Sequence, residues 1–391
     1  MAKIDDSVKK KVPELRFKGF TDDWEERKLS DIADRFDNLR VPITASDRKS
    51  GDTPYYGANG IQDYVEGFTH DGEFILVAED GANDLKNYPV QYVNGKVWVN
   101  NHAHVLQGKN TITDNKFLMN SIKNFNIEPF LVGGGRAKLN ADVMMKLNIL
   151  LPTFDEQEKI GSFFSLLDDT IALHQRKLDL LKEQKKGYLQ KMFPKNGAKV
   201  PELRFAGFAD DWEERKLGDL GSVAMNKRIF KEQTSDVGDI PFYKIGTFGG
   251  TPDAFISRDI FEEYKSKYQY PEVGDILISA SGSIGRTVVY QGYDEYFQDS
   301  NIVWLKHDQQ LDNSFLKQFY SIVKWQGLEG STIKRLYNKN ILETKITLPS
   351  PEEQQKIGSF FKQLDNTITL HQRKLDLLKE QKKGFLQKMF I

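Results

Sequence analysis

The chain has 391 residues, 39% of them hydrophobic and 28% charged, a composition typical of a globular protein with two to three domains. It contains no cysteine, which excludes disulfides, thiolate metal sites and a cysteine nucleophile. The formal net charge is −1, so any nucleic-acid-binding surface must be a local one, because such proteins usually carry a basic surplus.

The first residues, Met1–Leu15, are polar and lack the apolar segment of a secretion signal, and we expect a short frayed tail here. No apolar run in the chain approaches the roughly 18 to 20 residues that span a bilayer. These features predict a cytoplasmic protein.

Two blocks of sequence occur twice. Val12–Leu29 returns at Val200–Leu217 with 16 of 18 residues identical, and Leu151–Phe193 returns at Leu348–Phe390 with 34 of 43 identical. The segments between the blocks, 30–150 and 218–347, show no alignment. A recent duplication alone would leave similarity along the whole repeat, and not only in the blocks. The pattern therefore indicates two variable segments carried on one constant frame.

The repeats divide the chain into four parts. They are an N-terminal segment with a first globular domain (1–150), a central helix (151–199), a second globular domain (200–347) and a C-terminal helix (348–391).

The first variable segment reads as a mixed α/β domain with short strands. The apolar stretches Gly72–Ala82, Tyr88–Asn100 and Met144–Pro152 predict strands, with Asn-Gly pairs as turns. Two stretches between strands combine turn residues with aromatic or basic side chains, which could stack on bases or approach phosphates. The candidate DNA contacts are Tyr55, Tyr56, Asn59, Arg136, Lys138 and Asn140.

The first constant helix is predicted to start near Pro152, where proline and acidic residues suit a helix N-terminus. Its apolar residues recur at alternating intervals of four and three, which is the heptad pattern of a coiled coil. The seam consists of Ile160, Phe164, Leu167, Ile171, His174, Leu178 and Leu181.

The second variable segment also predicts a mixed α/β domain. Strands are expected within Gly274–Gly292, Asp299–His307 and Leu342–Pro349. A small-residue loop and a basic loop again offer close approach to a nucleic-acid backbone, although an ordinary surface loop explains each one taken alone. The candidate contacts are Lys244, Ser281, Ser283, Arg286, Lys334, Arg335 and Tyr337.

The second constant helix carries the same seam, and we expect the two helices to pair as an antiparallel coiled coil with pseudo-twofold symmetry. His174 and His371 are expected to set the register. A pH switch or a metal site is the alternative, but two histidines alone make a poor zinc site. The second seam consists of Ile357, Phe361, Leu364, Ile368, His371, Leu375 and Leu378.

Three short patterns suggest enzymatic chemistry. Pro252-Asp253 with Glu263-Tyr264-Lys265 satisfies the loose PD…ExK pattern of Mg²⁺-dependent nucleases, but the second part reads as a polar helix or loop, not a strand. Asp52–Tyr56 resembles the signature of adenine methyltransferases, with threonine where a proline belongs. His102 and His104 read as surface histidines. No phosphate-binding loop is present, and no catalytic or metal-binding residue is predicted.

The doubled frame resembles a known family. Two VPELRF…DDWEERKL blocks, two divergent segments and two LHQRKLDLLKEQKKG helices are similar to the specificity subunit of type I restriction–modification systems. The resemblance covers essentially the whole chain. It implies that each globular domain is a target recognition domain reading one half of a bipartite, asymmetric site in double-stranded DNA, as part of a defence against foreign DNA.

The resemblance also implies partners. The helices would set the gap between the half-sites and dock two modification subunits, which methylate adenine with S-adenosylmethionine. Two restriction subunits would add ATP- and Mg²⁺-dependent cleavage, and the chain itself would bind no cofactor and catalyse nothing. An autonomous nuclease with a dimerising coil, or a scaffold that does not touch DNA, are the alternative hypotheses.

Neither variable segment is basic. Residues 30–150 hold 12 Lys and Arg against 15 Asp and Glu, and residues 218–347 hold 15 against 17. We therefore expect the isolated chain to bind DNA weakly and with strong salt dependence.

Overall fold

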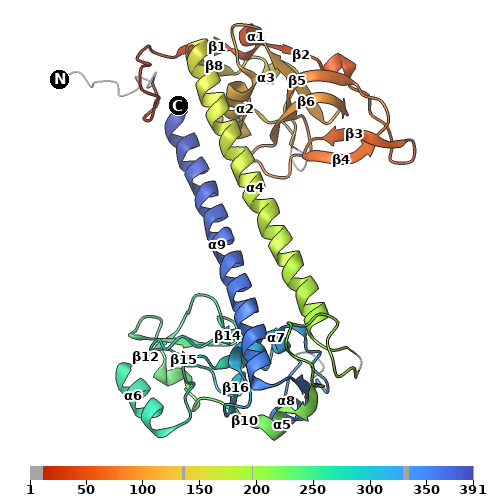
Figure 1. Ribbon diagram of the computed structural model, residues 1–391. Helices are drawn as coiled ribbons and strands as arrows, with labels where there is room; N and C mark the ends of the chain where they lie inside the picture. Colours follow the sequence, from red (N-terminus) through yellow and green to blue (C-terminus); the bar gives the residue numbers. More distant parts are fainter. Residues whose placement is uncertain (1–11, 134–136, 196, 329–333, 391) are drawn as a thin grey trace, which may run out of the picture. The chain divides into compact units, whose positions relative to one another are not determined.

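The computed structural model describes residues 12–133, 137–195, 197–328 and 334–390. The predicted contact Arg136 and most of the predicted N-terminal tail lie outside these ranges. The chain divides into a first unit of residues 1–176 and 373–391 and a second unit of residues 177–372, so each unit includes part of both long helices. Both units combine helices and sheets, which confirms the predicted α/β class (Figure 1).

The first unit is organised by a six-stranded sheet in the order β2-β7-β5-β6-β3-β4. Neighbours are antiparallel except β3 and β6, which run parallel. A separate antiparallel pair joins β1 to β8. The strands are β1 (Glu25–Lys28), β2 (Ala33–Arg35), β3 (Ser50–Gly57), β4 (Gly60–Val65), β5 (His70–Ala78), β6 (Val90–Val99), β7 (Ala103–Gly108) and β8 (Asn148–Leu151).

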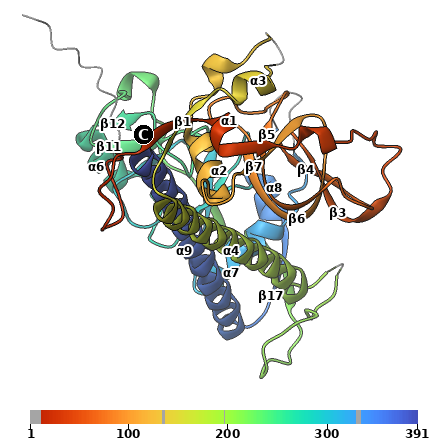
Figure 2. The same ribbon diagram turned by 90° about the horizontal axis from the view of Figure 1, so that it is seen from above.

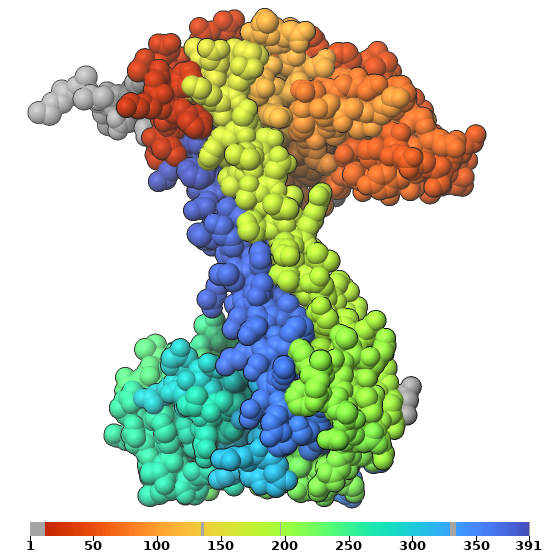
Figure 3. Space-filling model, viewed as in Figure 1, coloured from red at the N-terminus to blue at the C-terminus, as the bar shows by residue number. Residues whose placement is uncertain are grey.

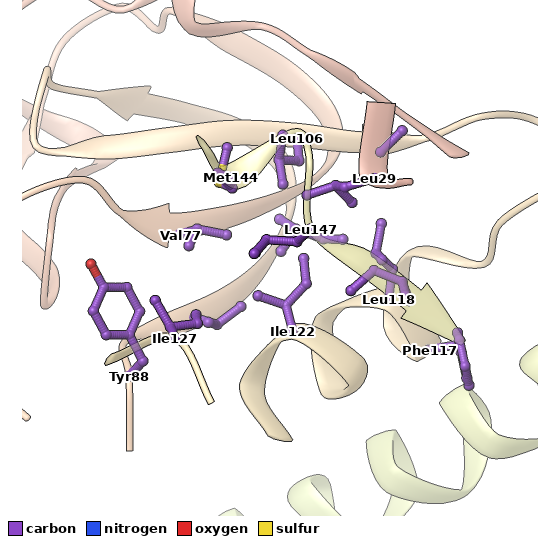
Figure 4. Close-up of a cluster of buried hydrophobic side chains, with 14 of the residues drawn as sticks. Leu29, Val77, Tyr88, Leu106, Phe117, Leu118, Ile122, Ile127, Met144 and Leu147 are labelled. Carbon is purple, nitrogen blue, oxygen red and sulfur yellow. The ribbon is translucent and has the colours of Figure 1, made fainter. Parts of the chain in front are cut away.

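The main core of the first unit lies between the helix α2 and one face of the sheet. Figure 4 shows Phe117, Leu118 and Ile122 of α2 among Val77 of β5 and Leu106 of β7, all of them buried. The helix starts at Asp114, whose carboxylate accepts a hydrogen bond from the backbone N–H of Phe117. The short helices of this unit are α1 (Leu29–Ile32), η1 (Asp37–Leu39), α2 (Asn115–Asn124), η2 (Glu128–Phe130) and α3 (Ala141–Met144).

The second unit contains a four-stranded sheet in the order β10-β16-β13-β14, a three-stranded sheet β12-β11-β15 and the pair β17-β9. Its strands are β9 (Glu213–Lys216), β10 (Gly221–Ala224), β11 (Ile240–Tyr243), β12 (Phe255–Ile256), β13 (Ile276–Ser279), β14 (Thr287–Val289), β15 (Tyr296–Phe297), β16 (Ile302–His307) and β17 (Lys345–Leu348). Its short helices are α5 (Leu217–Leu220), η3 (Lys231–Gln233), α6 (Arg258–Lys267), α7 (Asn313–Ile322) and α8 (Asn338–Glu343).

The two variable segments share one framework, although their sequences show no alignment. The central strand β5 is antiparallel to β7, and β13 is antiparallel to β16 in the same way. The strand β3 runs parallel to the end of β6, as β11 runs parallel to β15. Helix α7 begins at Asp312 with the same capping bond that starts α2. The shared pairing was hidden because most side chains on it differ.

One predicted turn is also wrong. Asn94-Gly95 lies inside the continuous strand β6, opposite Gly72 and Glu73 of β5. Gly72 and Gly95 face each other with φ of 139° and 92°, values that only glycine adopts without strain. The pairing of β5 with β6 therefore continues through the glycine pair without a turn.

The long helices are α4 (Phe154–Met192) and α9 (Pro351–Met389). The start of α4 confirms the prediction near Pro152, and α9 begins in the same way just after Pro349. Every seam residue is buried or half-buried. In the first unit Phe163 contacts Phe385, with ring centroids 5.2 Å apart, and Asp168 pairs with Lys382. Partner numbers fall as residue numbers rise, so these helix segments run antiparallel, as the first unit in Figures 1 and 2 shows.

The second unit contains the equivalent contacts. Tyr188 contacts Phe360 at 5.1 Å between ring centroids, and Lys185 pairs with Asp365 at 2.6 Å. An offset of 197 residues converts each of these contacts into its counterpart in the first unit. The repeated helix sequence is therefore used twice in the same antiparallel packing.

The other constant block fastens the start of each long helix to a globular domain, α4 in the first unit and α9 in the second. Arg16 donates two hydrogen bonds of 2.7 Å to the fully buried carboxylate of Glu156 near the start of α4. Arg204 holds Glu353 at the start of α9 with bonds of 2.8 and 2.7 Å. Such bidentate pairs are short and fix geometry. They give a physical reason why Arg16 and Arg204 occupy the same place in the two copies of the block.

A glutamine beside each of these glutamates joins the helix to the globular part. The Gln157 side chain accepts from the backbone N–H of Asp114 and donates to the carbonyls of Ile112 and Pro152, at 3.0 Å each. Gln354 makes the corresponding three bonds in the second unit. Among the described residues, no helix is long and apolar enough to cross a membrane.

Candidate nucleic-acid interface

The polar residues of the first unit gather beyond the end of β5. Asp80 follows this strand, and its carboxylate lies 2.6 Å from Nδ1 of His102, just before β7. Lys138 pairs by its backbone with Asp80 and Val132, which brings the predicted basic loop to the same edge. Asn59, at the turn between β3 and β4, donates to the carbonyl of Gly81 at 2.9 Å. The predicted contacts Asn59 and Lys138 therefore lie at one edge of the sheet.

A buried charge network supports this edge. His104 is 1% exposed, and its two ring nitrogens lie 2.7 Å from Asp37 Oδ2 and 2.8 Å from the carbonyl of Leu139. Both ring nitrogens therefore contact oxygen atoms inside the domain, and neither faces solvent. His104 is thus an interior residue, and its prediction as a surface histidine is wrong.

Two cations complete the network at Glu79. Arg40 contacts this carboxylate at 2.7 Å and Lys138 contacts it at 2.9 Å. Burial would raise the pKa of Glu79, but the bonds from Arg40 and Lys138 outweigh it, so the pKa is lowered. Burial would likewise raise the pKa of Asp37, and the hydrogen bond from His104 lowers it overall.

Three side chains of this network could in principle be metal ligands. Asp37, Glu79 and His104 place one ligand atom each within 4.8 Å of one another, and in the described part of the chain no other set does so. Arg40 and Lys138 already neutralise the carboxylates, and a cation would have to displace them. The residues therefore fit an ion-pair network that holds Lys138, and they do not fit a metal centre.

Not all predicted contacts of the first unit reach this edge. Tyr55 is 1% exposed, with the guanidinium of Arg48 4.2 Å from its ring centroid, so its ring is not available for base stacking. Tyr56 is half-buried against a second hydrophobic cluster of the sheet, which includes Val99, and burial raises its pKa. Asn140 is exposed at the start of α3. The aromatic pair is therefore largely a packing feature of β3.

The second unit builds the same edge from different residues. Ser281 follows β13 and donates through Oγ to Oδ1 of Asn301, just before β16, at 2.7 Å. Arg335 pairs by its backbone with Ser281. Ser283 and Arg286 form the turn between β13 and β14, where Arg286 donates to the carbonyl of Phe248 at 2.7 Å.

The remaining contacts predicted in the second unit are solvent-accessible. Lys334 and Tyr337 are exposed beside Arg335, and Lys244 at the end of β11 pairs with Asp253 at 2.9 Å. Sequence reasoning missed Asp80, His102 and Asn301. A comparison of ILVAEDG (Ile75–Gly81) with ILISASG (Ile276–Gly282) could have located the shared strand end.

The enzymatic patterns do not assemble sites. Asp253 pairs with Lys244, Glu263 with Lys267 at 2.9 Å and Lys265 with Asp294 at 3.7 Å, and the last two patterned residues lie on the helix α6. The expectation of a helix or loop in place of a strand is confirmed. Asp52–Tyr56 lies within strand β3.

Comparison with known proteins decides the family. The model of the type I restriction modification DNA specificity domain matches residues 21–183 and 209–380. The chain belongs to this family. Its two matches fall on the two repeats, one in each half of the chain. The family match supports the specificity-subunit assignment and gives no support to the autonomous nuclease.

Relatives span nearly the whole of this specificity subunit. A Haemophilus influenzae protein, named as a candidate type I restriction enzyme specificity subunit, is 46% identical over 360 residues, covering 88% of this chain and 89% of the relative. The MjaVIII specificity subunit of Methanocaldococcus jannaschii is 22% identical over 93% of this chain and 91% of its own. A type I S subunit from M. genitalium shares the fold, with a TM-score of 0.72, 15% identity and coverage of 97% and 99%.

Proposed function

We propose that this specificity subunit reads a two-part, asymmetric site in double-stranded DNA, with one half-site for each globular domain. The observation that carries the proposal is the shared framework, which presents different polar residues at the same edge of each domain. Equal frameworks predict equal modes of docking on DNA, while different side chains at the edge predict different half-sites.

We infer that the chain itself is not catalytic. S-adenosylmethionine, ATP and Mg²⁺ would be bound by two modification subunits and two restriction subunits. Support comes from the ion pairs described above, which engage the carboxylates of both the PD…ExK pattern and the Asp37 cluster. Cytoplasmic location fits such partners.

A row of exposed leucines supports docking of the modification subunits on the long helices. Leu166, Leu173 and Leu180 recur every seven residues on α4 and are 67%, 66% and 52% exposed. Leu370 and Leu377 occupy the equivalent positions on α9. Figure 3 shows that side chains of both helices reach the surface. A heptad row opposite the buried seam is suited to a further pair of helices, one from each partner.

Introducing negative charges into this leucine row should separate the chain from the modification subunits. In the variant Leu173→Glu with Leu370→Glu, we expect co-purification with the modification subunit to fall at least tenfold, because each carboxylate would be buried without a partner in the interface. The measurement is pull-down followed by quantitative gel analysis. Ala172→Glu with Thr369→Glu alters exposed neighbours on the same helices and should bind normally. Equal binding by both variants would contradict docking on this row.

The proposed function is tested by a genome-wide map of methylated adenine in cells that express this chain with its modification subunit. We expect a gapped, two-part motif that disappears when the chain is deleted. The purified chain alone should bind a DNA fragment carrying that motif weakly and lose binding steeply with salt. An ungapped motif, or methylation that persists without the chain, would contradict the proposal.

A further inference from the structure

The two domains can be aligned residue by residue at the edge beyond β5 and β13. In the first domain the N–H of Glu79 donates to the carbonyl of His102 at 2.8 Å, and in the second the N–H of Ala280 donates to the carbonyl of Asn301 at 2.7 Å. Each of these bonds extends the strand pairing by one step. His102 and Asn301 therefore occupy the same position.

The basic loops align by the same means. The N–H of Leu139 donates to the carbonyl of Glu79 at 2.7 Å, and the N–H of Leu336 donates to the carbonyl of Ala280 at 2.8 Å. Both leucines are buried, so they anchor the loops in equivalent places. It follows that Lys138 corresponds to Arg335, and that Asp80 corresponds to Ser281.

The backbone is thus the same at three positions, while the side chains differ in their hydrogen-bonding chemistry. The first domain holds an Asp80–His102 pair and the second holds a Ser281–Asn301 pair, with nearly equal contact distances of 2.6 and 2.7 Å. Lysine stands beside the first pair and arginine beside the second. Each domain therefore presents a different set of donors and acceptors at the same place on the framework.

The edge is also accessible. The side chains of His102 and Lys138 are 36% and 44% exposed, and Arg335 is exposed. Gly81 and Gly282 follow Asp80 and Ser281 with φ of 67° and 64°, so each strand ends in a tight turn with no side chain to cover the pair. A base edge can therefore approach from solvent.

We infer that these three positions form one base-reading site in each recognition domain, and that their different side chains make the two half-sites differ. The inference rests on the proposed function. In the major groove a carboxylate accepts from cytosine N4, lysine and arginine contact guanine, and asparagine contacts adenine. The first set, Asp80, His102 and Lys138, therefore suits a C·G pair, whereas the second set, Ser281, Asn301 and Arg335, offers contacts to adenine and guanine.

The remaining difference concerns the cation. Glu79 holds Lys138 at 2.9 Å, but alanine at position 280 provides no carboxylate for Arg335. Lys138 is thus held in place within its domain before DNA binds. To reach a base it must either leave Glu79 or contact Glu79 and the base together. Arginine can contact guanine by two bonds from a planar, pre-organised fork of donors, whereas the lysine ammonium is a flexible point charge.

The test transplants the second pair into the first domain. Asp80→Ser with His102→Asn is expressed in the full chain with its modification subunit, and methylated adenine is mapped across the genome. We expect one or two positions of one half-site to change, with at least a tenfold shift in methylation between old and new sequences. The other half-site and the gap should stay the same. The reverse exchange, Ser281→Asp with Asn301→His, should alter only the other half-site.

Asp71→Ser is the matched control, because Asp71 is exposed at the opposite end of β5. It should leave the motif unchanged. A double variant with normal thermal unfolding and an unchanged motif would overturn the inference, as would a uniform loss of methylation at all sites. If the double variant does not fold, His102→Asn alone is judged by the same criteria. Absence of a two-part motif with the unaltered chain would refute the proposed function itself.

Discussion

Replacing Phe390 with alanine is expected to destabilise the first unit by about 3–5 kcal/mol, the usual cost of truncating a buried phenylalanine. This residue follows the last turn of α9 and is 7% exposed. Its ring stacks on Phe117 at 5.5 Å and meets Trp24 edge-on at 6.3 Å between centroids. The measurement is the urea midpoint, together with hydrogen exchange of α2.

The second unit provides the matched experiment. Phe193 at the end of α4 stacks on Phe315 at 5.2 Å and meets Trp212 at 6.1 Å, so Phe193→Ala should loosen α7 and leave α2 protected. Phe230→Ala, at a 56% exposed position, should change stability by less than about 0.5 kcal/mol. A loss below 1 kcal/mol in Phe390→Ala would show that the helix end does not contribute to the core.

A fragment that ends at Pro194 should form a homodimer. The first unit needs the last part of α9 for its core, and the fragment ends instead in the last part of α4. The two helix ends read GYLQKMF and GFLQKMF, so Phe193 of one copy can take the place of Phe390 in the other. Light scattering after size-exclusion chromatography should report twice the monomer mass. With the modification subunit, the dimer should direct methylation to a palindromic site.

Phe193→Ala in this fragment is the control for helix exchange. It should shift the fragment to monomers at micromolar concentration, while the same substitution in the full chain leaves the first unit intact. A folded fragment that stays monomeric with Phe193 present would contradict the exchange. A dimer that Phe193→Ala does not weaken would place the contact elsewhere.

The repeat and the long helices were readable from the sequence because their determinants are local. Alternating intervals of four and three define an amphipathic helix, and near-identical blocks reveal a duplication without knowledge of any contact. The starts of α4 and α9 follow from proline and acidic residues placed next to the heptad pattern. The family resemblance rests on the same blocks.

The recognition edge could not be read in the same way. Asp80, His102 and Lys138 are distant in sequence and meet only because β5, β7 and a loop before α3 pair through backbone bonds. Backbone pairing places few demands on side chains, so the framework is kept while identity is lost. Tyr55 was predicted to contact DNA but is buried, because an aromatic residue beside a turn can face the core as easily as solvent.

The duplicated architecture, the coiled-coil seam and the family follow from the amino-acid sequence, since periodicity and repetition are properties of the chain alone. The folded structure adds the strand pairing that the variable segments share, the burial of His104 in an ion-pair network and the bonds by which Arg16 and Glu156 fasten helix to domain. These features depend on contacts between residues up to 140 positions apart. Such contacts are set by packing and burial, which local patterns do not encode.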